Sequence, residues 1–322
     1  MQENLSSVLK ISPKSISHNV SLQTRTWIHR GGIARTYFTP KDINELITIG
    51  KYLYTNKCVF DIIGHTSNMY FLNSYNPDYI IDTRKLKQAS ITKEQIVCDC
   101  GFPMAQLSRK CISLGIEGYE GFINIPGTVA GAVTNNSGCY GSITQDVLDK
   151  IELLTPDGTI TILHAKDLQY SERSSTLKRK EHVGIILRCY FKVGNQCAIS
   201  ELERRANINT SLRKYQHEGP SHNLGSVFVY SFQWKKNMRN ILILFINKIL
   251  TKLQVPEPTR NMISKYLLLT LYNKLELRPY ISNKNLKCYL WKSSDADKHF
   301  ATYVKLFNTF AVSPTLEIEV KK

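Results

Sequence analysis

The sequence predicts an α+β fold, and three observations lead to this class. Strand-like and helix-like segments alternate irregularly, without a repeating β-α-β order. The G-x-G-x-x-G fingerprint of a Rossmann domain is absent. A turn-dense stretch, residues 121–141, interrupts the regular pattern near the middle of the chain. At 322 residues the chain is long enough for two or three domains with a sizeable core.

The N-terminal part begins with residues 1–20, which we expect to form a loose leader. Residues 26–40 and then 42–54, with apolar residues at helical spacing in the second range, predict a strand, a turn and a helix. Residues 58–63 resemble a short buried strand that runs into the polar turn 64–68. A strand that feeds a turn rich in small hydrogen-bond donors suits a phosphate group, although the Walker lysine is missing.

Further strands and helices are predicted from alternating apolar residues and from apolar residues at helical spacing. Strands are predicted at 79–82, 96–101, 184–193 and 316–321, helices at 103–114, 202–212 and 297–310, and a hairpin at 147–154 and 159–163. The hairpin turn is Pro156-Asp157-Gly158.

Residues 121–141 contain five glycines and several small hydroxyl or amide side chains. Glycine permits positive φ and close approach of the main chain, and successive free N–H groups form a concavity that suits phosphate. The segment is therefore either a ligand cradle or a set of tight turns. For His65, in the earlier turn, a solvent-facing loop histidine is the favoured interpretation.

The composition is that of a globular protein, with 42% hydrophobic and 21% charged residues. The formal charge of +16 favours anionic partners such as nucleic acid, an acidic lipid surface or phosphorylated small molecules. A basic solvated surface without a partner is the alternative. The basic residues are spread along the chain and no zinc-finger, RNP or homeodomain pattern is present, which disfavours nucleic acid.

The eight cysteines form no C-x-x-C pair, so neither a metal site nor a disulfide is predicted, and reduced thiols fit a cytoplasmic protein. Residues 1–21 lack the apolar core of a signal peptide. The apolar runs 241–246 and 266–271 are too short to span a bilayer. They are expected as core faces of helices, and peripheral membrane contact stays open as an alternative.

The order of residues in the glycine-rich stretch adds a resemblance. Ile125-Pro126-Gly127-Thr128-Val129-Ala130-Gly131-Ala132, followed by Asn136-Ser137-Gly138-Cys139-Tyr140-Gly141, resembles the flavin-binding signature of the MurB family, the UDP-N-acetylenolpyruvoylglucosamine reductases (UDP-N-acetylmuramate dehydrogenases). Gly64, Ser67 and Asn68 match the family's glycine-rich turn, with His65 and Thr66 in place of glycines. The resemblance implies non-covalently bound FAD in a fold of the vanillyl-alcohol-oxidase (PCMH) type.

Cofactor-binding residues are carried over from the two matching turns and one later strand. They are Gly64, His65, Thr66, Ser67, Asn68, Ile125, Pro126, Gly127, Thr128, Gly131, Ala132, Asn136, Gly138, Tyr140, Gly141 and Ile185.

Three further matches imply catalytic residues. Arg173 and Ser175 fit the family's Tyr-Arg-x-Ser, with Glu172 in place of the tyrosine. Gly225-Ser226-Val227-Phe228 is similar to the catalytic-serine motif, but Val229, Tyr230 and Ser231 replace the Lys-Asn-Pro that follows it in the family. The run 316–321 resembles the C-terminal signature and places Glu319 on the catalytic glutamate, although Glu317 shares its strand face.

The resemblance implies the following reaction. NADPH reduces FAD, the flavin passes a hydride to the enolpyruvyl group of a UDP-sugar, Ser226 delivers a proton, and Arg173 and Glu319 stabilise the intermediate. Taken singly, each of the three side chains fits an ordinary surface or turn role as well. The altered motif after Ser226 favours an alternative, an FAD protein of surface-polysaccharide synthesis with another substrate. A non-catalytic flavoprotein or membrane-peripheral scaffold is the third hypothesis.

The predicted domains are a leader at 1–20, two FAD-binding subdomains at 21–85 and 86–198, and an α+β substrate domain at 199–322. Within the last, residues 234–291 match nothing in the family's substrate domain. The sequence does not predict an oligomeric state.

Overall fold

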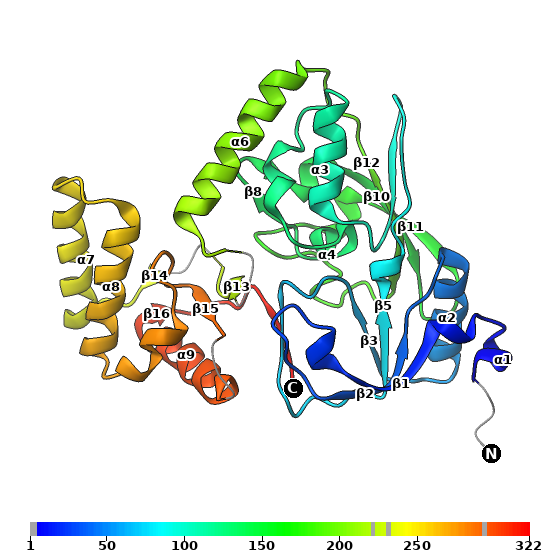
Figure 1. Cartoon of the computed structure of the whole chain (residues 1–322), viewed down its shortest axis with the longest axis horizontal. Helices are drawn as coiled ribbons and strands as arrows, with labels where there is room; N and C mark the ends of the chain where they lie inside the picture. Colours follow the sequence, from blue (N-terminus) through cyan, green and yellow to red (C-terminus); the bar gives the residue numbers. More distant parts are fainter. Residues whose placement is uncertain (1–4, 220–222, 230–232, 292–294) are drawn as a thin grey trace. The chain divides into compact units, whose positions relative to one another are not determined.

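The structure, a computed structural model, describes residues 5–219, 223–229, 233–291 and 295–322 (Figure 1). It contains two compact units. The first comprises the chain up to Arg25, Gly31–Thr66 and Tyr75–Thr210, and the second comprises Thr26–Arg30, Ser67–Ser74 and Ser211–Lys322. The units are therefore interleaved in sequence. The assignment of 21–85 and 86–198 to flavin and of 199–322 to substrate stays a prediction.

The first sheet of the first unit is mixed. Its strands, in spatial order, are β1 (Ile16–Ser21), β2 (Ile33–Phe38), β5 (Tyr79–Asp82) and β3 (Phe60–Ile63). β2 and β3 both run parallel to β5, and helix α2 (Ile43–Thr55) forms the crossover between them. The helix starts where the Asp42 side chain accepts a hydrogen bond from the Glu45 amide, and it buries one apolar face against the core.

The expectation of a loose leader is wrong for the described part of residues 1–20. This part contains α1 (Leu5–Leu9), the 3₁₀ turn η1 (Pro13–Ser15) and β1, which pairs antiparallel with β2. The buried Glu45 carboxylate holds the segment by accepting hydrogen bonds from the Ser12 amide at 3.0 Å and the Ser15 hydroxyl at 2.7 Å. The sequence did not predict this strand, because its residues are mostly polar and its order comes from pairing with β2.

The second sheet of the first unit is antiparallel throughout. Its strands, in spatial order, are β11 (Ile160–His164), β10 (Leu148–Leu154), β12 (Ile185–Phe191), β7 (Ile96–Asp99) and β6 (Ala89–Ile91). The predicted hairpin is confirmed as β10 and β11. The other elements of this unit are η2 (Leu22–Thr24), η3 (Thr83–Lys85), α3 (Met104–Ser113), η4 (Glu120–Asn124), α4 (Val129–Thr134), β8 (Gly138–Cys139), β9 (Ser142–Ile143), α5 (Thr144–Val147) and η5 (Ala165–Leu168).

Helix α6 (Ile199–Gln216) begins in the first unit and ends in the second. Among its described residues, the second unit has three two-stranded sheets and three longer helices. The pairs are β4 (Met69–Phe71) with β17 (Glu319–Lys321), β13 (Asn223–Ser226) with β15 (Cys288–Leu290), and β14 (Gln233–Trp234) with β16 (Ala311–Val312). The helices are α7 (Met238–Lys252), α8 (Glu257–Leu271) and α9 (Ala296–Phe310), with η6 (Leu275–Tyr280) between α8 and β15.

The core of the second unit is aromatic. Tyr70 stacks on Phe300 with ring centroids 4.0 Å apart, and Phe228 stacks on Phe307 at 4.1 Å. The helix predicted at 297–310 is confirmed as α9, which buries Phe300, Phe307 and Phe310. The core role expected for 266–271 is confirmed in part, since Leu268 and Leu269 are buried.

Candidate functional site

The two glycine-bearing turns of the first unit meet at Gly64 and Thr128. A β-carbon on Gly64 would lie 2.7 Å from both the methyl and the hydroxyl group of Thr128. Gly64 directly follows β3, and Thr128 directly precedes α4. Only a residue without a β-carbon permits this approach of the Gly64 main chain to the Thr128 side chain.

His65 strengthens the contact between the two turns. Its imidazole is half-buried and hydrogen-bonds the carbonyl of Gly127, so the solvent-facing interpretation is wrong. Burial, and then the charges of Arg84 and Lys87, lower the pKa of His65 below its usual value. The next residue, Thr66, is buried and has a φ of 56°.

Thr128 also organises the helix that follows it. Its hydroxyl accepts a hydrogen bond from the Gly131 amide at 3.2 Å and caps the N-terminus of α4. Gly131 is exposed, whereas Ala132 packs in the core. Ile125 and Pro126 are half-buried and come directly after η4.

The second half of the glycine-rich stretch is a run of strained turns. Asn136, Tyr140 and Gly141 have φ values of 43°, 47° and 88°. The buried Asn136 side chain donates to the Gln145 amide oxygen at 2.9 Å and to the Ser171 carbonyl at 3.1 Å. Its carboxamide thus holds the turn to the segment that carries Arg173.

Arg173 lies in a tight turn against the glycine-rich stretch. Ser171 and Ser174 exchange two backbone hydrogen bonds of 3.1 Å, and Arg173 between them has a φ of 55°. The Arg173 guanidinium donates to the Gly138 carbonyl at 2.9 Å. The structure therefore brings this predicted catalytic residue to the predicted flavin segment within one unit.

Two side chains downstream of Arg173 fix this turn. The Ser175 hydroxyl donates to the Thr134 carbonyl at 2.6 Å. The Lys178 ammonium donates to the Arg173 carbonyl at 2.8 Å and to the Asn135 side chain. The sequence predictions omitted Lys178. Its only signal was a basic residue in a polar turn, which is usually a solvated surface residue.

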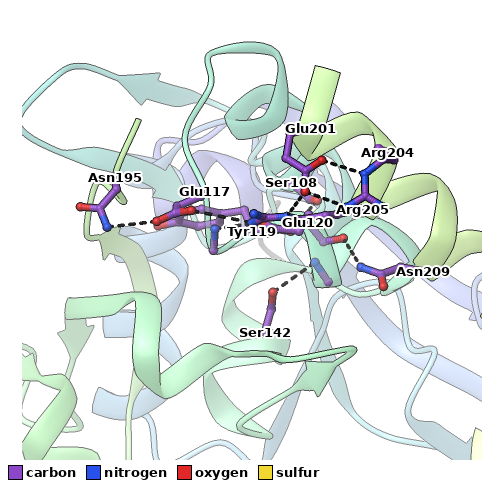
Figure 2. A network of polar contacts seen from close by, with 12 residues as sticks. Ser108, Glu117, Tyr119, Glu120, Ser142, Asn195, Glu201, Arg204, Arg205 and Asn209 are labelled. Atoms are coloured by element: carbon purple, nitrogen blue, oxygen red, sulfur yellow. Dashed lines mark hydrogen bonds and ion pairs between the residues drawn. The ribbon is translucent and has the colours of Figure 1, made fainter. Parts of the chain in front are cut away.

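A polar network holds the start of the glycine-rich stretch to α6 (Figure 2). Arg205 donates to Glu120 at 3.2 Å and to Glu201 at 2.9 Å. Arg204 and Arg205 lower the pKa of Glu201 to about 2, because the carboxylate accepts hydrogen bonds from both guanidinium groups. Gly121 packs on Ser142, whose hydroxyl accepts from the Gly121 amide at 3.1 Å (Figure 2).

Ile185 does not join these turns through its side chain. It begins β12 and is fully buried in the hydrophobic core, where its methyl group lies 2.7 Å from the position that a β-carbon on Gly50 would take. Since Gly50 belongs to α2, this side chain packs a helix on the sheet.

The remaining predicted site residues lie in the second unit. The Asn68 side chain donates to the Glu317 carbonyl at 3.1 Å, and the Glu319 amide donates to the Asn68 carbonyl at 3.0 Å. The Glu317 amide in turn donates to the carbonyl of Val227, the residue after Ser226. The C-terminal strand therefore lies beside both the Ser67–Asn68 turn and the serine motif.

The two candidate glutamates differ in burial. Glu317 is buried, whereas the Glu319 side chain is 53% exposed and forms an ion pair with Lys321 at 2.5 Å. Ser226 is half-buried and pairs with Cys288 across β13 and β15. Of the two carboxylates, that of Glu319, at the start of β17, is therefore the more exposed to solvent.

The geometry fits a dinucleotide cofactor. Gly64 and Gly131 place backbone without a side chain beside Thr128, and a β-carbon on Gly141 would meet nothing within 4 Å. Such turns accept phosphate through main-chain N–H groups. In the described ranges, no group of three or more His, Cys, Asp or Glu residues could hold a metal ion.

Comparisons with known proteins agree with this geometry. Residues 34–164 match the family described as FAD binding domain. The UDP-N-acetylenolpyruvoylglucosamine reductase of Caldicellulosiruptor saccharolyticus is 33% identical over 201 residues, which are 62% of this chain and 64% of that protein. The enzyme of the same name from Synechocystis is 28% identical over 217 residues, 66% of this chain and 68% of that protein.

Together these comparisons support the UDP-N-acetylenolpyruvoylglucosamine reductase (MurB) family as the one that this chain resembles. The crystal structure of MurB from Thermus caldophilus is similar over 94% of this chain and 98% of that chain, with a TM-score of 0.66 and 20% identity. This likeness confirms the fold. The predicted α+β class with an FAD-binding fold of the vanillyl-alcohol-oxidase type is thus confirmed, as is FAD as the cofactor.

The sequence match to the C. saccharolyticus protein spans slightly less than two thirds of its length. The roles of single residues stay predictions. Tyr230 and Ser231, which replace family residues after Ser226, lie outside the described residues. No helix in the described ranges combines the length and apolarity needed to cross a bilayer.

Proposed function

We propose that this MurB-like protein is an FAD-dependent reductase that uses NADPH to reduce the enolpyruvyl group of a UDP-sugar in cell-wall synthesis. The observation that carries the proposal is the Arg173 turn, whose guanidinium bonds Gly138 within the flavin-binding stretch. The left-handed turn at Arg173 is held by the Ser175 hydroxyl and the Lys178 ammonium, so the guanidinium has a fixed position beside this stretch. The +16 charge suits three anionic ligands: FAD, NADPH and the UDP-sugar.

The chain's own residues have separate tasks in this proposal. FAD, when bound, supplies hydride chemistry that no side chain provides. Ser226 holds the proton that is delivered to the carbon next to the one reduced. Arg173 and Glu319 polarise the substrate carboxylate and stabilise the negative charge that develops beside it. A serine hydroxyl is a weak acid, so neighbouring charge must lower the cost of this proton transfer.

Anaerobic spectroscopy tests the proposal in two steps. NADPH should bleach the absorbance of the bound flavin, and UDP-N-acetylglucosamine enolpyruvate should restore it. Ser226→Ala should keep the first step and lose turnover by roughly 100-fold or more, because it removes only the proton donor. Ser90→Ala, at an exposed position of β6, is the matched control. Normal turnover by Ser226→Ala would refute the serine assignment, and absence of bleaching would refute the reductase.

A second candidate is a MurB-like reductase of surface-polysaccharide synthesis with another substrate. Val229 favours it, because this residue stands where the family has lysine and its side chain is buried. Its amide donates to the Thr315 carbonyl at 3.0 Å, so the residue is part of the fold of the second unit. Bleaching by NADPH without reoxidation by the enolpyruvyl sugar would identify this case.

A further inference from the structure

Helix α7 exposes most of its apolar side chains to solvent, which is the reverse of an ordinary amphipathic helix. Its buried residues are Asn240 and Ile243, whereas Met238, Ile241, Leu242, Phe245 and Ile249 are exposed. At 3.6 residues per turn these five side chains lie along one face. The expectation that residues 241–246 form a core face is therefore confirmed for Ile243 alone and wrong for Ile241, Leu242, Leu244 and Phe245. We call the five residues, with Leu253 just beyond the helix, the apolar face of α7.

Specific hydrogen bonds fix this orientation. The fully buried Asn240 side chain donates to the Lys235 carbonyl at 2.7 Å and to the Phe310 carbonyl at 2.9 Å. It also accepts from the Tyr272 hydroxyl at 2.8 Å. Rotating α7 to bury its apolar face would break all three bonds and expose Ile243. The fold of the second unit thus presents apolar side chains to solvent at a cost of hydrophobic burial.

The exposed apolar surface is large for a water-soluble helix. Met238 is 81% exposed, Phe245 59% and Leu253 69%. Figure 1 shows α7 and α8 side by side as an antiparallel hairpin, and the side chains of the apolar face are exposed although the two helices are in contact. A continuous exposed apolar stripe on a soluble domain marks an interaction surface.

The charges around the face identify the kind of partner. Residues 235–256 contain five basic residues and no acidic one. The basic residues are Lys235, Lys236, Arg239, Lys248 and Lys252. Lys248 and Lys252 lie on the exposed side of the helix beside Ile249. Apolar side chains flanked by lysines on one helix face are typical of helices that lie in the interface of anionic membranes.

We propose that the apolar face of α7 docks the protein on an anionic lipid surface, with the helix lying along the membrane. The apolar side chains enter the acyl boundary, and the flanking lysines contact lipid phosphates. A second copy of this chain is a poorer occupant, because a twofold contact through α7 would bring two sets of basic side chains together without acidic partners. The proposal does not depend on the proposed reductase activity.

Vesicle flotation of the full-length protein tests the proposal. The protein should float with vesicles of phosphatidylcholine and phosphatidylglycerol and not with phosphatidylcholine alone, and about 0.5 M NaCl should weaken binding by screening. Ile241→Ser combined with Phe245→Ser should lower the partition coefficient by roughly thirtyfold. Lys248→Ala and Lys252→Ala should each lower it by about fivefold.

The matched control changes exposed apolar residues elsewhere. Ile160→Ser with Ile162→Ser, on strand β11, removes side chains of similar exposure and should leave vesicle binding unchanged. The proposal is overturned if the wild-type protein does not float with the anionic vesicles, or if the α7 and β11 variants bind equally. It is also overturned if light scattering shows a dimer that the α7 variant dissociates, since a second copy then covers the face.

Discussion

At the scale of single residues, Lys178 is the side chain on which the position of Arg173 depends. Its ammonium group donates hydrogen bonds to both the Arg173 carbonyl and the Asn135 side chain, so it joins the two segments. Lys178→Met keeps most of the length and volume but removes the donor. Because Arg173 then loses its left-handed turn, we expect kcat to fall about tenfold with a smaller change in KM, as for misplacement of a catalytic group.

Steady-state kinetics with NADPH and the UDP-sugar measure this effect. Flavin content and the melting temperature serve as readouts of a purely structural role, and both should change little. Lys178→Arg, which keeps a charged donor of similar reach, should restore part of kcat. An equal loss of kcat in the arginine and methionine variants would contradict a positioning role for Lys178.

Glu45 is the residue that anchors the N-terminal strand, and it predicts a pH dependence. Burial raises the pKa of its carboxyl, but hydrogen bonds from the Lys41 and Ser12 amides and the Ser15 hydroxyl outweigh burial and lower it. A carboxyl with a lowered folded-state pKa stabilises the fold above its unfolded pKa of about 4.3, and this contribution is lost as the pH falls further.

We expect Glu45→Gln to lower the free energy of unfolding at pH 7 by about 1–3 kcal/mol, because buried donors lose an ionised acceptor. The variant should also lose stability less steeply than the wild type between about pH 5 and pH 3. Urea unfolding at several pH values measures both effects. Glu94→Gln, in an exposed turn, is the control and should match the wild type. Parallel pH curves for the Glu45 variant and the wild type would rule out this role.

At the scale of elements, local sequence patterns predict helices and hairpins. They fail to predict an element, or the face that it buries, where contacts with distant segments determine it. Helix α3 and the β10–β11 hairpin are formed nearly as predicted, because apolar spacing and a Pro-Asp-Gly turn specify them locally. Strand β1 could not be predicted from its polar residues, since it is ordered by pairing with β2. The buried face of helix α7 was predicted wrongly, because the hydrogen bonds of Asn240 with the Phe310 carbonyl and the Tyr272 hydroxyl determine it.

The candidate site shows the same division. The glycine-rich stretch could be predicted, because glycines and small polar residues are the types that turns with exposed backbone require. The contact of Gly64 with Thr128 and the support from Lys178 could not, because each joins residues from separate turns. The burial difference between Glu317 and Glu319 also arises only from strand pairing in the second unit.

The contact between the two turns predicts the effect of one added methyl group. Gly64→Ala places a β-carbon 2.7 Å from Thr128, so the turns must separate. Phosphate binding through the backbone requires both turns in place, and we expect FAD affinity to fall at least about tenfold. Titration of the apoprotein with FAD, followed by flavin fluorescence, measures this affinity. Gly219→Ala is the control, because a β-carbon there would meet nothing within 4 Å. Unchanged affinity in the Gly64 variant would show that the turns do not form the cradle.

At the scale of the whole molecule, the interleaving of the two units decides which fragments can fold. The second unit takes Thr26–Arg30 and Ser67–Ser74 from the N-terminal part of the chain. The second of these segments supplies β4, which is the parallel partner of β17. Arg30 forms an ion pair of 2.6 Å with Asp297, and the Tyr70 hydroxyl donates to the same carboxylate at 2.8 Å.

A fragment of residues 211–322 should therefore fail to fold by itself. Without the two N-terminal segments, Asp297 loses Arg30 and Tyr70, Phe300 loses its stacking partner Tyr70, and β17 has an unpaired edge. We expect the isolated fragment to lack a cooperative thermal transition and dispersed amide resonances, whereas the full-length chain shows both. Adding a peptide of residues 67–74 should restore part of the structure, because it returns β4 and the Tyr70 ring. A cooperative transition in the isolated fragment would mean that the second unit folds without strand β4.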